Sequence, residues 1–230
     1  MISLRPRLET VLRMLAGADA VADIGCDHGR LAAALLQRHV ASRVIATDIS
    51  FASLEKAVAL KDACGIGENL ELRVGDGLSA LGEDRPDALV FTGMGGELIR
   101  SLLDKERKIA RAARRIVMQP MRGVEELRAY LYENGYGIYD EALVLDAKRT
   151  YQIIAAHPWE PAQKPEGWPE SLCEIGWVLF EKRDPLLLTY VRQRLQEYER
   201  RLTHAPQNAH KLRQAAKDLG WLLERLEEET

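Results

Sequence analysis

This sequence of 230 residues contains few cysteines and few aromatic residues, and neither positive nor negative charge is in large excess. Its three cysteines, Cys26, Cys64 and Cys173, are too few and too scattered for a disulfide framework, and they lack the C-x-x-C spacing of a zinc site. No apolar run approaches the roughly 18 residues that span a bilayer, and the first residues lack the apolar core of a signal peptide. We therefore expect a reduced, cytoplasmic, soluble protein with no metal site and no membrane contact.

The charge balance excludes a protein that coats nucleic acid along its whole surface. Lysine and arginine number 32 against 35 aspartates and glutamates, and 47% of the residues are hydrophobic. Such a chain forms a core and does not coat nucleic acid indiscriminately. However, basic residues outnumber acidic ones by seven to two in residues 100–115 and again in residues 190–217. These stretches are either RNA-binding surfaces or merely solvated faces, and phosphate contacts through them would depend on salt.

Short apolar runs alternate with helical patterns up to about residue 157. The patterns predict helices over 31–40, from Ser50 or Ser53 to Cys64, and over 124–134. This alternation predicts an α/β fold, with a mostly parallel, Rossmann-like sheet covered by helices on both faces. The last two strands form a hairpin, so we expect an antiparallel strand at one edge. The predicted strands are 20–24, 43–49, 70–74, 88–92, 115–119, 136–145 and 151–157.

The composition changes after residue 157. Four prolines, Pro158, Pro161, Pro165 and Pro169, exclude a continuous helix or a central strand there. Apolar residues then recur every three or four positions over 188–202 and over 212–226, which predicts two antiparallel amphipathic helices. We divide the chain into a catalytic domain (1–157), a proline-rich connecting segment (158–185) and a coiled-coil-like helical hairpin (186–230). The hairpin either only packs on the main domain or also grips a substrate.

Acidic and glycine-containing segments follow four of the predicted strands. In an open α/β sheet, ligands bind at the carboxyl ends of the strands. We assign Asp23 to a cationic or hydroxyl group, Asp48 to the two hydroxyls of a ribose and Asp76 to an adenine amino group. Asp48 taken alone is equally well explained as a helix cap. The predicted cofactor-binding residues are Asp23, Gly25, Cys26, Asp27, His28, Asp48, Ile49, Asp76, Gly77, Gly93, Met94 and Gly95.

The acidic turn between Gly25 and Gly29 distinguishes between two nucleotide-type cofactors. A dinucleotide needs the pattern G-x-G-x-x-G, so that its pyrophosphate can sit on a helix N-terminus. This turn instead holds Asp27, whose carboxylate would repel a phosphate. S-adenosylmethionine carries a sulfonium and an ammonium group and no phosphate, so Asp23 and Asp27 favour it. The pattern therefore predicts a methyltransferase in preference to a nicotinamide-dependent dehydrogenase.

Several of these segments resemble those of the bacterial tRNA (adenine-22-N1)-methyltransferases. They are D-I-G-C-D-H (23–28), G-D-G-L (75–78), G-M-G-G (93–96), Gln119-Pro120 and Tyr151, and the resemblance covers nearly the whole chain. It implies S-adenosylmethionine as methyl donor, tRNA as partner and N1-methyladenosine as product. The family patterns read D-I-G-S-D-H and Q-P-N, whereas this chain has Cys26 and Met121. Cysteine is nearly isosteric with serine, but Met121 lacks the amide, so we assign it no base contact.

Adenine N1 carries a lone pair, so the enzyme's task is to expose this atom and align it with the donor methyl. Because the product ring is cationic, we assign Asp27 to stabilising that charge or to accepting a proton from the exocyclic amine. Asp27 is equally well explained as a ligand of the methionine moiety or as a helix cap. We interpret His28 as a hydrogen-bonding group rather than a base.

The remaining assignments concern the RNA. Gln119 and Tyr151 are candidates to contact the target adenine, although a purely structural role fits each equally well. The predicted substrate-binding residues are Arg5, Arg7, Gln119, Tyr151, Arg192, Arg201 and Lys211. Two alternatives stay open. One is a methyltransferase of the same fold that acts on another RNA, a protein or a small molecule, and the other is a non-catalytic tRNA-binding module.

Overall fold

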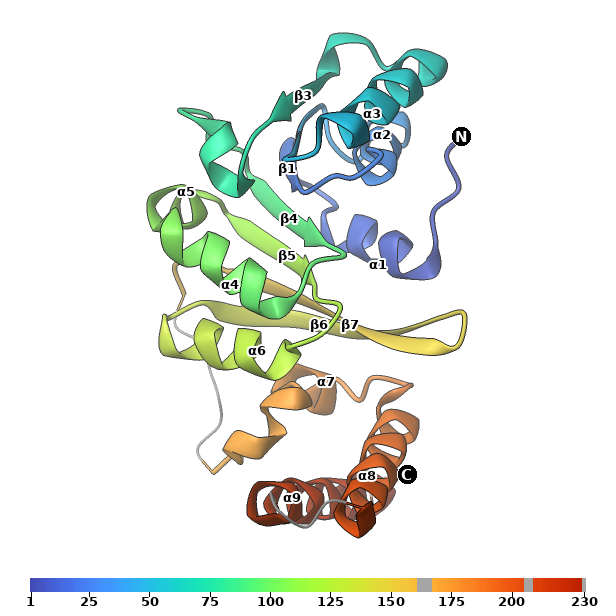
Figure 1. Cartoon of the computed structure of the whole chain (residues 1–230), viewed down its shortest axis with the longest axis vertical. Helices are drawn as coiled ribbons and strands as arrows, with labels where there is room; N and C mark the ends of the chain where they lie inside the picture. Colours follow the sequence, from blue (N-terminus) through green and yellow to red (C-terminus); the bar gives the residue numbers. More distant parts are fainter. Residues whose placement is uncertain (161–166, 205–208, 229–230) are drawn as a thin grey trace.

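A computed structural model describes residues 1–160, 167–204 and 209–228 of the chain. Seven strands form one sheet in the order β3-β2-β1-β4-β5-β7-β6 (Figure 1). The strands are β1 (Ala20–Ile24), β2 (Arg43–Asp48), β3 (Leu70–Val74), β4 (Ala88–Thr92), β5 (Arg115–Gln119), β6 (Gly137–Asp146) and β7 (Arg149–His157). The predicted strands agree with these bounds within two residues at either end.

The direction of the strands confirms the predicted fold class. Strands β1 to β5 pair in parallel, and β7 pairs antiparallel with both β5 and β6. The reversed strand β7 thus lies one place in from the edge, and β6 is the edge strand. Parallel pairing brings the carboxyl ends of β1 to β5 to one side of the sheet, where ligands bind in such folds.

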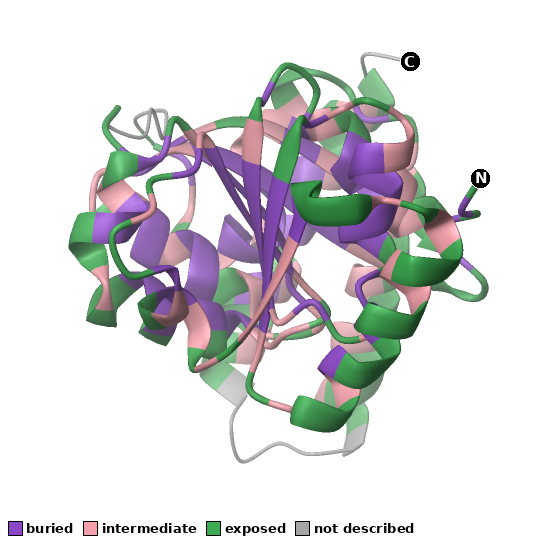
Figure 2. Ribbon diagram, turned by 90° about the horizontal axis from the view of Figure 1, so that it is seen from above, coloured by how far each residue is buried: buried purple, intermediate pink, exposed green. Residues whose placement is uncertain are grey.

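Helices cover both faces of the sheet (Figure 2). On one face lie α1 (Pro6–Met14), α2 (Arg30–Gln37) and α3 (Phe51–Cys64), and on the other lie α4 (Gly96–Lys105), α5 (Arg107–Ala112) and α6 (Val124–Glu133). Within β1, Val21 belongs to the first core, whereas Ala22 and Ile24 belong to the second. This alternation follows from the two-residue repeat of a strand. Helices α4 and α5 were not among the predicted elements.

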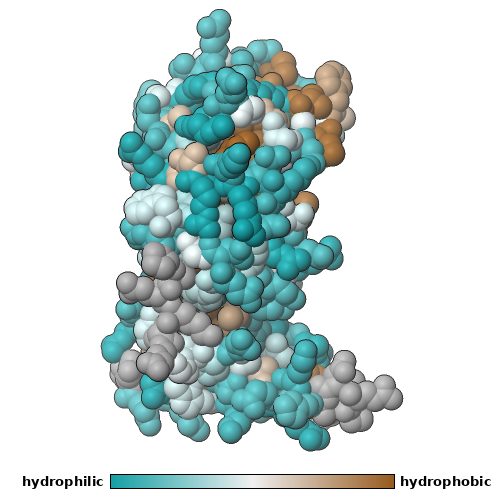
Figure 3. All heavy atoms as spheres, turned by 90° about the vertical axis from the view of Figure 1, so that its left-hand side faces the viewer, coloured by the Kyte–Doolittle hydropathy of each residue, from teal (hydrophilic) through white to brown (hydrophobic). Residues whose placement is uncertain are grey.

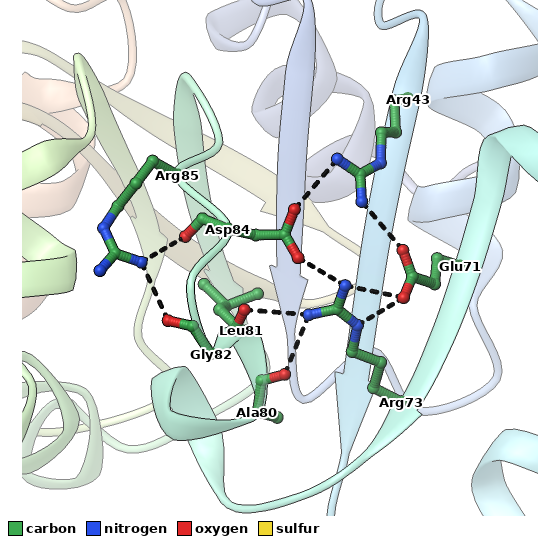
Figure 4. Close-up of polar contacts among 8 residues, drawn as sticks. All are labelled: Arg43, Glu71, Arg73, Ala80, Leu81, Gly82, Asp84 and Arg85. Carbon is green, nitrogen blue, oxygen red and sulfur yellow. Dashed lines mark hydrogen bonds and ion pairs between the residues drawn. The ribbon is translucent and has the colours of Figure 1, made fainter.

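Two short 3-10 helices flank β3, η1 (Gly67–Asn69) and η2 (Gly77–Leu81). A network of four charged side chains lies beside them (Figure 4). Arg73 pairs with Glu71 and Asp84, and Arg43 pairs with the same two carboxylates, at distances of 2.6–3.1 Å. Arg73 Nη1 also donates to the carbonyls of Ala80 and Leu81 at the end of η2. The network therefore anchors η2, which begins directly after Asp76.

The C-terminal helices lie beyond β6, at the edge of the sheet opposite β3 (Figure 1). They are α7 (Trp177–Glu181), α8 (Leu187–His204) and α9 (Ala209–Glu228), preceded by η3 (Glu170–Glu174). A third core joins β6 to η3, α7, α8 and α9. Four of its buried members come from the segment expected to be only a connection: Trp168, Leu172, Ile175 and Leu179. The division of the chain into three segments remains our proposal.

A buried ion pair fastens this C-terminal part to the sheet. Arg128 of α6 and Glu141 of β6 are both fully buried and lie 2.7 Å apart. Arg128 also donates to Gln152 of β7 and to the carbonyl of Cys173 in η3.

In the part of the chain that is described, no helix combines the length and apolarity needed to cross a membrane. The face seen in Figure 3 is mostly hydrophilic, with apolar side chains gathered towards its upper end.

Candidate functional site

A cavity of about 920 Å³ lies at the carboxyl ends of β1, β2, β3 and β4. Eleven of the twelve residues predicted to bind cofactor line it, including the four acids Asp23, Asp27, Asp48 and Asp76. The exception, Gly95, is the N-cap residue of α4. Gly75 of the G-D-G-L segment and Met121, to which no base contact was assigned, line the cavity as well. Seven further lining residues were not predicted from the sequence: Ser3, Leu8, Arg30, Leu31, Thr92, Leu98 and Leu102.

The turn after β1 is held by the end of β2. The backbone N–H groups of Gly25 and Cys26 both donate to the carbonyl of Thr47, at 2.8 and 2.9 Å. The backbone N–H of Asp27, which has a left-handed φ of 52°, donates to Asp48 Oδ2 at 2.9 Å. The Asp48 carboxylate therefore helps to fix the backbone conformation of the turn. Each of its oxygens retains a further lone pair for a ligand.

The helix cap at the start of α3 is supplied by a different residue. The backbone N–H of Ser50 donates to Asp48 Oδ1 at 2.8 Å, and Ser50 Oγ then accepts the N–H of Ser53 at 3.2 Å. Ser50 is thus the N-cap residue, as one of the two sequence alternatives had it. Asp48 lies two residues before the cap, and it lines the cavity.

Asp23 is the most deeply buried acid of the cavity. Its side chain is 1% exposed, and neither carboxylate oxygen has a hydrogen-bond partner among the described side chains and backbone. Burial raises the pKa of Asp23 to about 7, against a lowering effect of the Ala32 backbone and with a smaller raising effect of the nearby Asp48. A buried carboxylate without a partner is costly, and a bound cation relieves that cost. Asp23 therefore fits the positively charged group of a ligand.

Asp27 and His28 in the same turn are much more exposed than Asp23. The Asp27 side chain is 74% exposed, and His28 Nε2 lies 3.3 Å from its Oδ1 and 3.2 Å from Lys56 Nζ. Asp76 Oδ2 accepts a hydrogen bond from Lys105 Nζ at 2.8 Å, so a ligand would share or displace this lysine. Cys26 is buried, and burial raises the pKa of its thiol above the usual range, which keeps the thiol protonated.

Gly25 has a left-handed backbone conformation and lies close to the end of the Met94 side chain. Its φ is +70°, and a Cβ atom there would lie 2.1 Å from Cε of Met94. Met94 itself lines the cavity, so a larger residue at position 25 would drive the Met94 side chain out of its place. Gly25 thus allows the turn after β1 to approach the Met94 side chain, which follows the neighbouring strand β4.

The residues predicted to bind RNA fall into two separate groups. Arg5 and Arg7 line the cavity, and Arg7 Nη1 donates to Oε1 of Gln119 at 2.5 Å. Gln119 is fully buried at the end of β5, and its Nε2 donates to the carbonyl of Pro120. Tyr151 lies below the Arg7 guanidinium, 5.6 Å from the ring centroid. Neither Gln119 nor Tyr151 forms part of the described cavity wall.

The second group lies on the C-terminal hairpin. Arg192 pairs with Glu227 at 2.7 Å, and Arg201 lies over the ring of Tyr198. Lys211 lines a different groove of about 1020 Å³, between α6, η3 and the hairpin. The structure does not bring these three basic residues to the cofactor cavity. That groove is strongly acidic, with Glu125, Glu126, Glu133, Glu170, Glu174 and Asp218 in its wall.

Much of the basic stretch 100–115 is engaged within the chain. Lys105 pairs with Asp76, Arg107 pairs with Asp104, and Arg111 donates to the carbonyls of Asn134 and Gly135. Its charge count alone therefore overstates the surface available to RNA.

Residues 4–154 match the family model described as a methyltransferase domain. The chain belongs to this family. The curated tRNA (adenine(22)-N(1))-methyltransferase of Bacillus subtilis (strain 168) is 27% identical over 222 residues, which cover 94% of this chain and 93% of that protein.

Two solved structures share the fold over the full length of this methyltransferase. The crystal structure of the B. subtilis M1A22 tRNA methyltransferase TrmK has a TM-score of 0.80 and 26% identity, with 99% of both chains covered. M. capricolum TrmK, solved in complex with S-adenosyl-homocysteine, has a TM-score of 0.81 and 20% identity, with 97% of this chain and 98% of that chain covered. Both likenesses include the C-terminal hairpin.

Proposed function

We propose that this methyltransferase transfers a methyl group from S-adenosylmethionine to N1 of adenine 22 in tRNA. The observation that carries the proposal is the likeness to the B. subtilis enzyme over more than nine-tenths of both chains. The cavity supports the proposal, because its acids stand at the ends of successive strands. A tRNA substrate also implies that the enzyme works in the cytoplasm.

The residues of the cavity fit the proposed cofactor. Asp23 would accept the ammonium group, because its two buried oxygens have no partner among the described residues. Asp48 would accept the ribose hydroxyls, and Asp76 would accept the adenine amino group next to Ile49 and Gly77. Gly93 and Met94 would lie beside the reacting end. When bound there, S-adenosylmethionine supplies an electrophilic methyl group.

The protein contributes to the reaction by exposing the target adenine, by aligning it with the methyl donor and by offsetting the charge that develops on its ring. Adenine N1 must be unpaired before it can approach the cavity, and its lone pair then attacks without prior deprotonation. Asp27 stands at the mouth of the cavity with an exposed carboxylate, where it would offset the positive charge that develops on the ring. His28 would restrain Asp27 through their 3.3 Å contact.

Tritiated methyl transfer to unmodified tRNA transcripts, followed by nucleoside analysis, tests the proposal. We expect N1-methyladenosine at position 22, and its loss when that adenine is replaced by guanine in the transcript. Methylation of a protein or small-molecule fraction with no transfer to any transcript would instead support the same-fold alternative. Binding of tRNA without any transfer would support the non-catalytic module.

The role of Asp27 needs a separate measurement. Asp27→Asn should lower the turnover number more than it weakens binding of the methyl donor, because the carboxylate acts on charge that appears during the reaction. The opposite pattern would make Asp27 a ligand of the donor only. Asp19→Asn provides a matched control, because Asp19 lies just before β1, at the far end of that strand.

A further inference from the structure

Arg7 is the common partner of side chains from the ends of three strands. Its Nη1 donates to Gln119 at the end of β5, its Nε lies 3.5 Å from Oδ2 of Asp146 at the end of β6, and its guanidinium lies over Tyr151 of β7. Gln119 is fully buried and Asp146 is 7% exposed. One hydrogen bond to Gln119, the ion pair with Asp146 and the ring of Tyr151 therefore hold a guanidinium that also lines the cavity.

The remaining donors of Arg7 are available to a ligand. A guanidinium carries five N–H groups, and among the described residues none accepts a hydrogen bond from Nη2. Arg7 is held by residues of β5, β7 and β6, and its partner Gln119 also contacts Met121, whereas Asp23 and Asp48 stand at the ends of β1 and β2, on the other side of β4 in the strand order. Met121 is itself held there, because its N–H donates to the carbonyl of Met94 and its own carbonyl accepts from Arg149.

The charge of Arg7 is offset locally, whereas that of its neighbour is not. Asp146 supplies one negative charge against the Arg7 guanidinium. No ion pair or hydrogen bond of the Arg5 side chain occurs within the described part of the chain, although Arg5 lines the same cavity two residues earlier, at the N-cap position of α1. A neutralised donor can face a base that becomes cationic, because it adds little repulsion. An uncompensated arginine suits a phosphate better.

We propose that Arg7 is a specificity-determining residue, which donates to an uncharged acceptor of the target adenosine, and that Arg5 contacts a phosphate. This inference rests on the proposed function. Gln119 is then a positioning residue that acts through Arg7, rather than a direct contact of the base. The arrangement links α1 to substrate recognition and gives the first turn of that helix two separate tasks.

Steady-state methyl transfer to tRNA tests Arg7 through Arg7→Lys and Arg7→Ala. We expect kcat/KM to fall about 10- to 100-fold in each, as for the loss of a hydrogen bond from a charged donor. Donor affinity, measured by calorimetry, should stay within twofold of the wild type. Arg13→Lys is the matched control, because Arg13 lies on the same helix and donates to Thr10. Unchanged kcat/KM in both Arg7 variants, or a large loss of donor affinity, would overturn the proposal.

The salt dependence of tRNA binding separates the two arginines. Arg5→Ala should reduce the slope of log affinity against log salt by about 0.7–0.9, the value of one phosphate contact, whereas Arg7→Ala should leave the slope unchanged. A reduced slope for Arg7→Ala would make Arg7 a phosphate contact instead. Gln119→Ala combined with Arg7→Lys should be less than additive, and full additivity would remove the positioning role. If the wild type methylates no transcript, the proposed function itself fails.

Discussion

The carboxylate of Asp48 accepts the backbone N–H of Asp27 at 2.9 Å, so the end of β2 holds the turn that follows β1. Its second oxygen accepts the N–H of Ser50 at the start of α3. One side chain thus sets the spacing between two neighbouring loops of the cavity. This role exists before any ligand binds, and it adds to the contact with a ribose that we propose.

Asp48→Asn should therefore weaken both the ligand-free fold and donor binding. The amide nitrogen would face a backbone N–H, leaving that donor unsatisfied at a cost of about 1–3 kcal/mol. We expect the melting temperature of the free protein to fall by about 2–4 °C for each kcal/mol lost. Calorimetry should show donor affinity reduced at least about tenfold. An unchanged melting temperature would mean that Asp48 acts only through contact with the ligand. Asp62→Asn is the control, because Asp62 is an exposed residue of α3.

Gly25→Ala should abolish donor binding at a modest cost in stability. The new Cβ would displace Met94, and a left-handed φ costs an alanine roughly 1–2 kcal/mol. Gly17→Ala is a close control, because Gly17 has a φ of +83° but nothing within 4 Å of the added Cβ. We expect similar losses of unfolding free energy in both variants, measured in urea, with donor binding lost only in Gly25→Ala. Equal donor affinity in the two would show that Met94 moves without consequence.

All seven strands could be predicted from the sequence, because each is an apolar run bounded by turn residues. The acids of the cavity could be placed too, since parallel strands bring their carboxyl ends together. Helix α5 was missed because its six residues are too few to establish a period. The hydrogen bond from Arg7 to Gln119 could not be predicted, because the two residues are 112 positions apart and come together only when α1 packs on the sheet. Asp146 did carry a signal, as an acid at the end of a predicted strand.

The raised pKa of Asp23 predicts opposite pH trends for folding and for donor binding. In the free protein the pKa is about 7, above the value of roughly 3.9 in an unfolded chain, so the folded state binds the extra proton between these values. The contribution of Asp23 to stability should therefore decline as the pH rises from about 4 to 7. Affinity for a cationic donor should rise over the same range, up to about tenfold per pH unit.

Asp23→Asn isolates this effect, because asparagine does not titrate. Urea unfolding and calorimetric titration, each from pH 5 to 8, should show steeper pH trends in the wild type than in the variant. Any titration of the donor itself appears in both proteins and cancels in the difference. Parallel curves for the two proteins would mean that Asp23 is ionised throughout and that its burial is relieved in solution.

The buried pair Arg128–Glu141 leads to the last prediction, which concerns stability alone. Both side chains are fully buried, so removing either one leaves a charge without its partner. Arg128→Met should lower the unfolding free energy by about 3–5 kcal/mol. The double variant Arg128→Met with Glu141→Leu should lose less than the sum of the singles, because no lone charge remains.

The adjacent residue of β6 supplies the comparison. Asp140 pairs with Lys182 at 2.6 Å, but both side chains are more than one-third exposed, so Lys182→Met should cost no more than about 1 kcal/mol. Limited proteolysis should then cleave the hairpin faster in Arg128→Met than in Lys182→Met, since Arg128 also holds η3 through the carbonyl of Cys173. Equal cleavage rates would mean that the third core around Leu143 and Leu172 alone secures the hairpin, and that the ion pair serves only to fix α6 against β6.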